Sequence, residues 1–395
     1  MKKAIITLAV LVMAFGNMGL AQRNFNLKSD ATQNVLKHYG IRSESTIVPE
    51  VAEYESLTGE RYRTTYTYDE IDYYLIEELM EIDEGDGWRD YMDVTYDYDF
   101  YGNVIQALAM SAFTGAWQNY FKADYTYEGG ELTEVVYQMW QNSSWMNVSK
   151  EVYNYNGDVT TVLYWIWNGS NWSSDELYTY TRNDNTIELI MQYMEGGAWQ
   201  NEGKQITTLN FDERITEILD QYWEGSSWVN SELTTYNYVG NVFPEKTIKE
   251  WYGEWEDFLK FTYEYDGNGN AKHGECFEMG DGWEPSDGDI EMTFSYGEKS
   301  VDYYGYHVDM TFVDLTGVKE NNATASFNLY PVPAQDEITI EANGFAKAEI
   351  YNVMGQKLIE SLSDRMNVST LASGLYIMKV YDQNGQSQMQ RFVVK

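Results

Sequence analysis

Eight tryptophans recur through the middle of the chain at intervals of 27 to 29 residues, each just after a short turn-like segment. They are Trp88, Trp117, Trp145, Trp172, Trp199, Trp228, Trp255 and Trp283. A fixed period of this length marks a repeated supersecondary unit, and each copy buries its apolar face against its neighbours. Any fold of this chain therefore has to build one similar element about eight times in succession.

Aromatic pairs and turn dipeptides keep phase with the tryptophans. Pairs such as Tyr96/Tyr98 and Tyr263/Tyr265 begin eight residues after a tryptophan, and turns such as Gly102-Asn103 follow them. Strand side chains alternate, so the two rings of a pair share one face of a sheet. Gly-Asn dipeptides suit tight hairpins because they accept positive φ. Each unit therefore predicts a strand, a turn, a second strand and a second turn.

The repeat pattern thus predicts antiparallel β-hairpins over residues 61–316, roughly 16 strands in all, in a twisted or coiled sheet. The pattern leaves open whether that sheet is open, spiral or closed. The composition agrees, because 35 Tyr and 13 Trp against 5 Pro favour half-buried strands, and no sustained period of about 3.6 residues predicts a helix. We predict an all-β fold: this array, then a small Ig-like β-sandwich at the C-terminus.

The N-terminus has the pattern of a secretory signal peptide over residues 1–21. Lys2 and Lys3 precede an apolar run, and Gly19-Leu20-Ala21 supplies small residues before Gln22. We therefore expect cleavage between Ala21 and Gln22. The apolar run is too short for a comfortable membrane span, so no transmembrane segment is predicted. Residues 22–60 carry little pattern and are expected to form a linker, or a cap over a sheet edge.

The formal net charge of −37 constrains the partners of the chain. Nucleic-acid binding requires a basic surface, so no nucleic-acid partner is expected. Acidity of this size could attract Ca²⁺ or a basic partner. A solvated, charged surface is the favoured interpretation, because strong net charge mainly promotes solubility.

Few residues are available for nucleophilic or metal chemistry. The three histidines are His38, His273 and His307, and they show no metal-ligand spacing. Cys276 is the one cysteine, so no intramolecular disulfide can form. His273 lies three residues before Cys276, and this separation puts the two side chains on opposite faces of a strand. We therefore predict that Cys276 is not a catalytic thiol.

One segment, Asp266-x-Asn268-x-Asn270, has the start of a calcium-binding loop. Phe277 stands where the closing glutamate of such a loop is needed, and Gly267-Asn268 fits a hairpin turn. The turn is the favoured interpretation. With no recognisable catalytic motif either, we predict no cofactor, no metal and no enzymatic activity.

The composition changes after Val318, where a short polar linker, residues 317–325, leads into residues 326–395. This last segment holds short β-rich runs and a near-neutral charge, which indicates a separate small domain. Its landmarks are Leu329, Tyr330, Pro331, Pro333, Gly355, Gly374, Tyr376 and the terminal Lys395.

These landmarks resemble the type A C-terminal sorting domain of the bacterial type IX secretion system. The run Leu329 to Ala334 is similar to the "LYPNPA" start of that family, although Val332 replaces its usual Asn. The resemblance implies that residues 326–395 bind the type IX secretion machinery. It also implies a secreted protein, or one on the outer-membrane surface of a Gram-negative bacterium.

The repeat motif itself resembles the tyrosine-aspartate (YD, or Rhs-type) β-hairpin repeat. The similarity is clearest where Tyr96-Asp97-Tyr98-Asp99 is followed by Gly102-Asn103, and again around Tyr263 to Asn268. This resemblance implies a hairpin architecture. No C-terminal toxin domain is evident.

We interpret the chain as an exported, non-catalytic repeat scaffold for binding or adhesion. An alternative is an extracellular glycan-binding protein that uses exposed Trp and Tyr side chains, and a third is a hydrolase of unrecognised type. The ligand could be a glycan or a protein. Less regular tryptophans on the second strands are the candidate ligand-binding residues: Trp140, Trp165, Trp167, Trp223 and Trp251.

Overall fold

The structure is a computed structural model that describes residues 47–69, 73–99, 101–295, 299–315, 327–342, 344–352, 357–372, 374–382 and 387–395. The predicted signal peptide, with Ala21 and Gln22, lies outside these residues. The chain divides into two compact units, the first ending at Val313 and the second beginning at Asp314 with the short segment Asp69–Tyr74 added to it. The described residues form strands and turns with no helix among them, so the predicted all-β class is confirmed.

The strands before the second unit begin with β1 (Ile47–Glu55), β2 (Arg61–Tyr68), β3 (Leu75–Asp83), β4 (Arg89–Tyr98), β5 (Val104–Ser111), β6 (Gln118–Glu128), β7 (Glu131–Gln141), β8 (Ser144–Asn156) and β9 (Val159–Trp167). They continue with β10 (Trp172–Asn183), β11 (Thr186–Glu195), β12 (Ala198–Leu209), β13 (Ile215–Glu224), β14 (Ser227–Val239), β15 (Val242–Trp251) and β16 (Trp255–Tyr265). The last are β17 (Ala271–Met279), β18 (Trp283–Pro285), β19 (Gly288–Phe294), β20 (Lys299–Gly305) and β21 (His307–Asp314).

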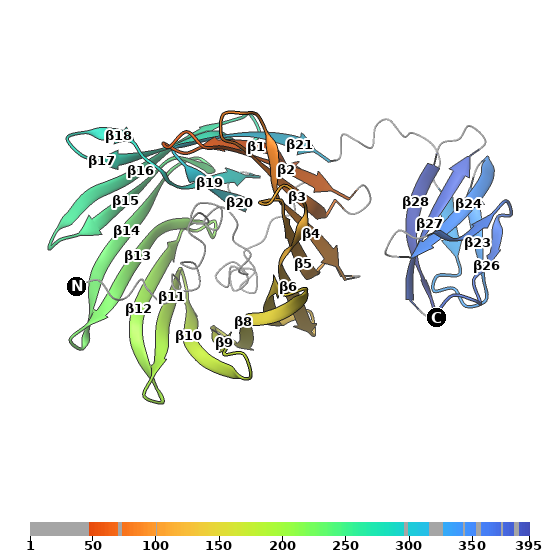
Figure 1. Cartoon of the computed structure of the whole chain (residues 1–395), viewed down its shortest axis with the longest axis horizontal. Coiled ribbons are helices and arrows are strands. Elements are labelled where there is room, and N and C mark those ends of the chain that lie inside the picture. The colour runs from red at the N-terminus through yellow and green to blue at the C-terminus, as the bar shows by residue number, and fades with distance from the viewer. Residues whose placement is uncertain are drawn as a thin grey trace. The chain divides into compact units, whose positions relative to one another are not determined.

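Nineteen of these strands, all except β19 and β20, form one sheet that closes on itself. Strands β1 to β17 pair in chain order as successive hairpins, β17 pairs with β21, and β21 pairs with β1 (Figure 1). The array that the sequence left as open, spiral or closed is therefore a closed ring of strands. Closure satisfies the backbone hydrogen bonds that an open edge would expose.

The N-terminal strand β1 completes this ring. We expected residues 22–60 to be a linker or a cap, but Ile47–Glu55 pairs with β2 from Val51↔Thr65 to Glu55↔Arg61. Ala52 and Tyr54 are buried in the core, and the residue between them is not. This alternation is that of a strand with one buried face, which explains why the segment joins the sheet.

The hairpin β19–β20 does not pair with the strands of the ring, and it lies in the interior that they enclose (Figure 1). Ile290 and Met292 of β19 are fully buried in the same core as the inner face of the ring. The packing against β17 is so close that a Cβ atom at Gly288 would lie 2.6 Å from Cys276 Sγ. The internal hairpin thus supplies core side chains that a ring of strands alone would lack.

A β-bulge recurs in the ring at the third residue after each of seven repeat tryptophans. The pairing registers skip Tyr91, Tyr120, Val148, Asp175, Glu202, Ser231 and Phe258. A bulge bends the strand and increases its local twist. Repeating the bulge in seven of the eight units therefore gives these hairpins a similar curvature, which favours closure of the sheet.

The second unit is a small β-sandwich. One sheet holds β22 (Phe327–Tyr330), β23 (Glu337–Ala342) and β26 (Arg365–Asn367). The other holds β24 (Phe345–Asn352), β25 (Lys357–Ser361), β27 (Gly374–Asp382) and β28 (Ser387–Val394). Apolar side chains from both sheets, such as Ile338 and Met378, share one buried cluster. This is the sandwich that the sequence predicted.

Candidate functional site

The tryptophans of the ring stay out of its core. All 13 tryptophans lie within the described residues, and not one of them is buried. They cluster near the turns that join β3 to β4, β5 to β6, and so on to β17 and β18, at one end of the ring. We call these 13 residues the tryptophan rim. A contiguous set of partly exposed aromatic side chains is a candidate surface for contact with a ligand.

The recurring bulge explains why the rim faces outward. Trp145 and Tyr153 are eight residues apart, so a regular strand would place both on the same face. The extra residue Val148 shifts the alternation between them, and Tyr153 is buried inside the ring while Trp145 is half-exposed. The same shift separates Trp172 from the fully buried Tyr180. These two units thus present their Tyr pair inward and their Trp outward.

Four of the five candidate ligand-binding residues pair with a repeat tryptophan across a hairpin turn. Each pair meets edge to face, with ring centroids 4.8 to 5.1 Å apart. The pairs are Trp140–Trp145, Trp167–Trp172, Trp223–Trp228 and Trp251–Trp255. The fifth residue, Trp165, lies opposite Ser174, two residues further from the turn. The structure therefore joins the two sets of tryptophans that the sequence separated.

Polar side chains border the rim on the outer face. An amide pair lies two residues behind the tryptophans in three hairpins: Gln138 Nε2 donates to Asn147 Oδ1 at 2.9 Å, and Gln192–Asn201 and Gln221–Asn230 repeat this bond. Each amide has more donors and acceptors than this bond uses.

Basic side chains stack on the rim from neighbouring strands. Lys150 Nζ lies 5.9 Å from the ring centroid of Trp165 and 5.4 Å from that of Trp172. The same ammonium lies 2.7 Å from Glu134 Oε2. Lys122 likewise faces Trp145 and pairs with Asp124. These cations are therefore compensated by carboxylates of the same face.

The inner face of the ring is lined with tyrosines and a few carboxylates. Glu151 is almost fully buried, and it accepts hydrogen bonds from Tyr137 Oη at 3.0 Å and Tyr153 Oη at 2.5 Å. Glu78 accepts one from Tyr96 Oη at 2.7 Å. Burial raises the pKa of Glu78, and the bond from Tyr96 only partly opposes it. Such groups satisfy a polar lining but cost free energy when ionised.

We expect the ring to gain stability as the pH falls from neutral toward about 4.5, the ordinary pKa of a glutamate. Burial raises the pKa values of Glu78, Asp220 and Glu232, so the folded state binds more protons than the unfolded state in this range. A tenfold difference in proton affinity between the two states corresponds to about 1.4 kcal/mol. Denaturant unfolding at several pH values checks this, and Glu78→Gln should flatten the profile. A stability that rises steadily toward pH 8 would contradict the expectation.

Within the part of the chain that the structure describes, Cys276 forms no catalytic pair with His273. Cys276 is fully buried on the inner face, and burial raises the pKa of its thiol to about 12. His273 faces the other side, where its Nδ1 lies 2.8 Å from Asp309 Oδ1. His38 lies outside the described residues. Within the described ranges, no group of three His, Cys, Asp or Glu residues could hold a metal ion.

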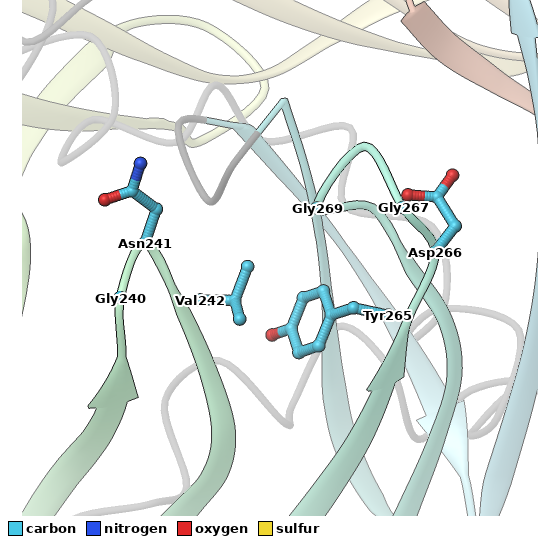
Figure 2. A pocket seen from close by; sticks show the side chains of 7 residues that line it. All are labelled: Gly240, Asn241, Val242, Tyr265, Asp266, Gly267 and Gly269. Atoms are coloured by element: carbon cyan, nitrogen blue, oxygen red, sulfur yellow. The ribbon is translucent and has the colours of Figure 1, made fainter.

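A shallow hollow lies at the opposite end of the ring from the rim, between the β14–β15 and β16–β17 turns. Figure 2 shows Val242 and Tyr265 facing each other across it, with Gly240, Asn241, Asp266, Gly267 and Gly269 around them. The Tyr265 hydroxyl donates to Phe243 O at 3.0 Å. Asp266 Oδ1 accepts from the backbone N–H groups of Asn268 and Asn270. The carboxylate therefore closes a turn, and the hollow offers little further chemistry.

The sorting-domain motif residues of the second unit include some near its first strand and some at its last strand. Ala334, just after Pro331 and Pro333, donates its N–H to Val393 O at 2.7 Å, and Lys395 N–H donates to Ala334 O at 2.8 Å. Leu329 and Tyr376 are buried in the cluster, Tyr330 is half-exposed, and Gly374 begins β27. Gly355 lies outside the described residues. The first and last parts of the motif are thus held side by side by backbone hydrogen bonds.

This compact sandwich and its motif are those of a C-terminal export tag. Residues 328–395 match the family described as "Secretion system C-terminal sorting domain". The chain therefore carries a sorting domain of the type IX secretion system, which indicates export to the cell surface or into the medium. Among the residues that the structure describes, we find no helix that is long and apolar enough to cross a membrane.

One curated relative matches over a limited stretch. The chain is 27% identical to Beta-agarase D of Zobellia galactanivorans over 77 residues, which are 19% of this chain and 16% of that protein. The chain thus covers a small part of that relative's length.

Similarity to solved structures is distant. A protein of unknown function from Bacteroides fragilis is 14% identical, covers 29% of this chain and 91% of its own, and gives a TM-score of 0.29. A porin-like protein from Bacteroides vulgatus is 12% identical over 59% of this chain and 96% of its own, with a TM-score of 0.32. The TcdB2-TccC3-Cdc42 structure is 13% identical over 64% of this chain and 16% of its own, with a TM-score of 0.32. The resemblance to YD repeats stays a prediction.

Proposed function

We propose that this protein is an exported, non-catalytic binding scaffold whose tryptophan rim contacts an extracellular ligand. It acts in the medium or on the outer surface of a Gram-negative bacterium, and the sorting domain delivers it there. The observation that carries the proposal is the position of the 13 tryptophans, which stay out of a core built of tyrosines and aliphatic side chains. Burying an indole stabilises a fold by about 2 kcal/mol or more, so its repeated display favours another role.

The repetition of the rim also supports binding over catalysis. The same Trp–Trp geometry recurs in four hairpins, with interplanar angles of 64° to 67°. An active site is generally a single departure from a repeat, whereas equivalent positions suit a ligand that is itself extended or repetitive. Edge-to-face pairs also fix the rings at little further cost in side-chain entropy, which prepares a surface for binding.

The test is binding of the purified chain to arrays that carry glycans and extracellular proteins side by side. We expect a signal that falls at least tenfold in the double variant Trp167→Ala/Trp223→Ala. Tyr101→Ala is the matched control, because this aromatic side chain is 81% exposed but lies in the β4–β5 turn at the other end of the ring. A signal that is unchanged in the double variant, or lost equally in the control, would overturn the proposal.

A further inference from the structure

Eight of the 13 rim tryptophans lie on four consecutive hairpins, from β7 to β14. We call the rim tryptophans of one hairpin its platform. Three of these hairpins, β7–β8, β11–β12 and β13–β14, combine a platform with the Gln–Asn pair two residues behind it. The hairpin β9–β10, between them, carries three tryptophans: Trp165, Trp167 and Trp172. Platform and amide therefore recur in the same relative position along the ring.

The spacing of these platforms follows from the sheet. Neighbouring strands lie about 4.8 Å apart, so equivalent tryptophans on successive hairpins are about 10 Å apart across the strands. The eight strands from β7 to β14 span about 34 Å along the curved wall of the ring. A ligand that contacts every platform is therefore long, thin and repetitive, and it lies perpendicular to the strands.

The side chains of the rim select the chemistry of that ligand. Indole faces offer flat apolar surface, and the amide pairs offer both donors and acceptors at hydrogen-bonding distance behind it. This combination is complementary to a sugar ring, which has apolar C–H faces and equatorial hydroxyls. A protein partner would be expected to need one contiguous buried centre, but the platforms form a row.

The charge of the chain disfavours a polyanionic ligand. The formal net charge is −37, so a sulphated or uronic polymer is repelled at long range. The cations that border the platforms do not reverse this locally, because Lys122, Lys150 and Lys204 each pair with a carboxylate of the same face. These three lysines therefore leave no net positive charge beside the platforms.

We propose that the rim from β7 to β14 binds an uncharged, extended polysaccharide that runs across the strands, with one platform on each hairpin. This inference rests on the proposed binding function and names its ligand class. The rim is then a row of similar subsites, and affinity grows with chain length because each further platform adds contact without a new association cost.

The experiment is isothermal titration of the full chain with cello-, xylo-, manno- and laminari-oligosaccharides of increasing length, with alginate and polygalacturonate oligomers as anionic probes. We expect at least one neutral series to bind, with an affinity that rises with length until the ligand exceeds about 34 Å. Trp223→Ala should weaken the longest ligand about tenfold, and Gln221→Leu about threefold. Tyr101→Ala should leave binding unchanged, and the thermal midpoint of each variant reports its folding.

Two outcomes would overturn the inference, and they differ from failure of the proposed function. Binding of anionic oligomers alone would contradict the charge argument. Array binding confined to proteins, yet still lost in the Trp167→Ala/Trp223→Ala variant, would keep the rim as a binding surface and reject the polysaccharide. If the wild-type chain bound nothing on the arrays, or bound equally well after the Trp167→Ala/Trp223→Ala substitution, the proposed function itself would be rejected.

Discussion

Deleting residues 326–395 should abolish export across the outer membrane and leave the chain in the periplasm. The deleted residues contain the whole sorting domain match, which covers residues 328–395. They form a compact unit with its own buried cluster, so their loss removes the tag without removing core residues of the ring. Fractionation of cells, with detection of the protein in the medium, on the surface and in the periplasm, measures the effect.

A shorter truncation tests whether the folded form of the tag is recognised. Removing residues 391–395 deletes Phe392 and Val394 from the cluster, and also the backbone partners of Ala334. We expect this variant to be trapped like the full deletion. Leu362→Ser is the matched control in the same unit, because this side chain is 79% exposed and its loss leaves the cluster intact. Normal appearance of the 326–395 deletion in the medium would defeat the export assignment. Normal appearance of the 391–395 truncation would show that the tag is recognised without an intact cluster.

The hairpins and the face of the Tyr pairs could be predicted from the sequence because both depend on local alternation. Tyr153 and Tyr155 share the inner face, as their spacing requires. The motif of the tail could be read for a similar reason, since its landmarks are consecutive or nearly so. These features are decided within one strand or one turn, where sequence carries most of the information.

The outward rim could not be predicted, because a bulge leaves no mark in this sequence. The extra residue is Tyr91, Val148, Asp175 or Glu202 in different units, so no residue type identifies it. Without the bulge, the even spacing between Trp and Tyr places both on one face. The one available signal was this conflict, since a single face cannot bury every indole and every tyrosine of a unit.

The closure of the ring and the position of its internal hairpin could not be predicted either, because both depend on contacts between strands that are distant in the sequence. β19–β20 alternates like any other hairpin of the chain, and its burial is decided by contacts with β1, β2 and β17. The buried lysine of β15 is a further example. Lys246 is 7% exposed, although a lysine in a strand normally indicates a solvent-facing position.

Replacing Lys246 by methionine should destabilise the ring by about 3 kcal/mol. Lys246 Nζ lies 3.4 Å from Glu291 Oε2 on the internal hairpin and 4.5 Å from the ring centroid of Phe261. Tyr236 Oη donates to the same carboxylate at 3.2 Å. The variant leaves Glu291 charged and largely buried with only the tyrosine as a partner, which is the costly case for a broken ion pair. Denaturant unfolding followed by near-ultraviolet circular dichroism measures the change.

The pH dependence of this contribution has a defined sign. Burial lowers the pKa of Lys246, but Glu291 and Tyr236 raise it by more, so the pKa lies above its ordinary value of 10.5. A cation with a raised folded pKa contributes stability at every pH below its unfolded pKa, and loses it as the pH rises through the folded value. The difference between the wild type and Lys246→Met should therefore stay constant from pH 6 to about 9 and shrink only in strong alkali.

Two further variants separate the ion pair from the general effect of losing a lysine. Lys249→Met removes the exposed partner of Asp257, three residues along the same strand, and should cost less than about 1 kcal/mol. The double variant Lys246→Met/Glu291→Leu removes both buried charges and should recover most of the stability lost in the single variant, because desolvation is then avoided. If Lys246→Met were as mild as Lys249→Met, the internal hairpin would be held by apolar packing alone. If the double variant were less stable than Lys246→Met, apolar side chains could not replace the ion pair, and this expectation would be wrong.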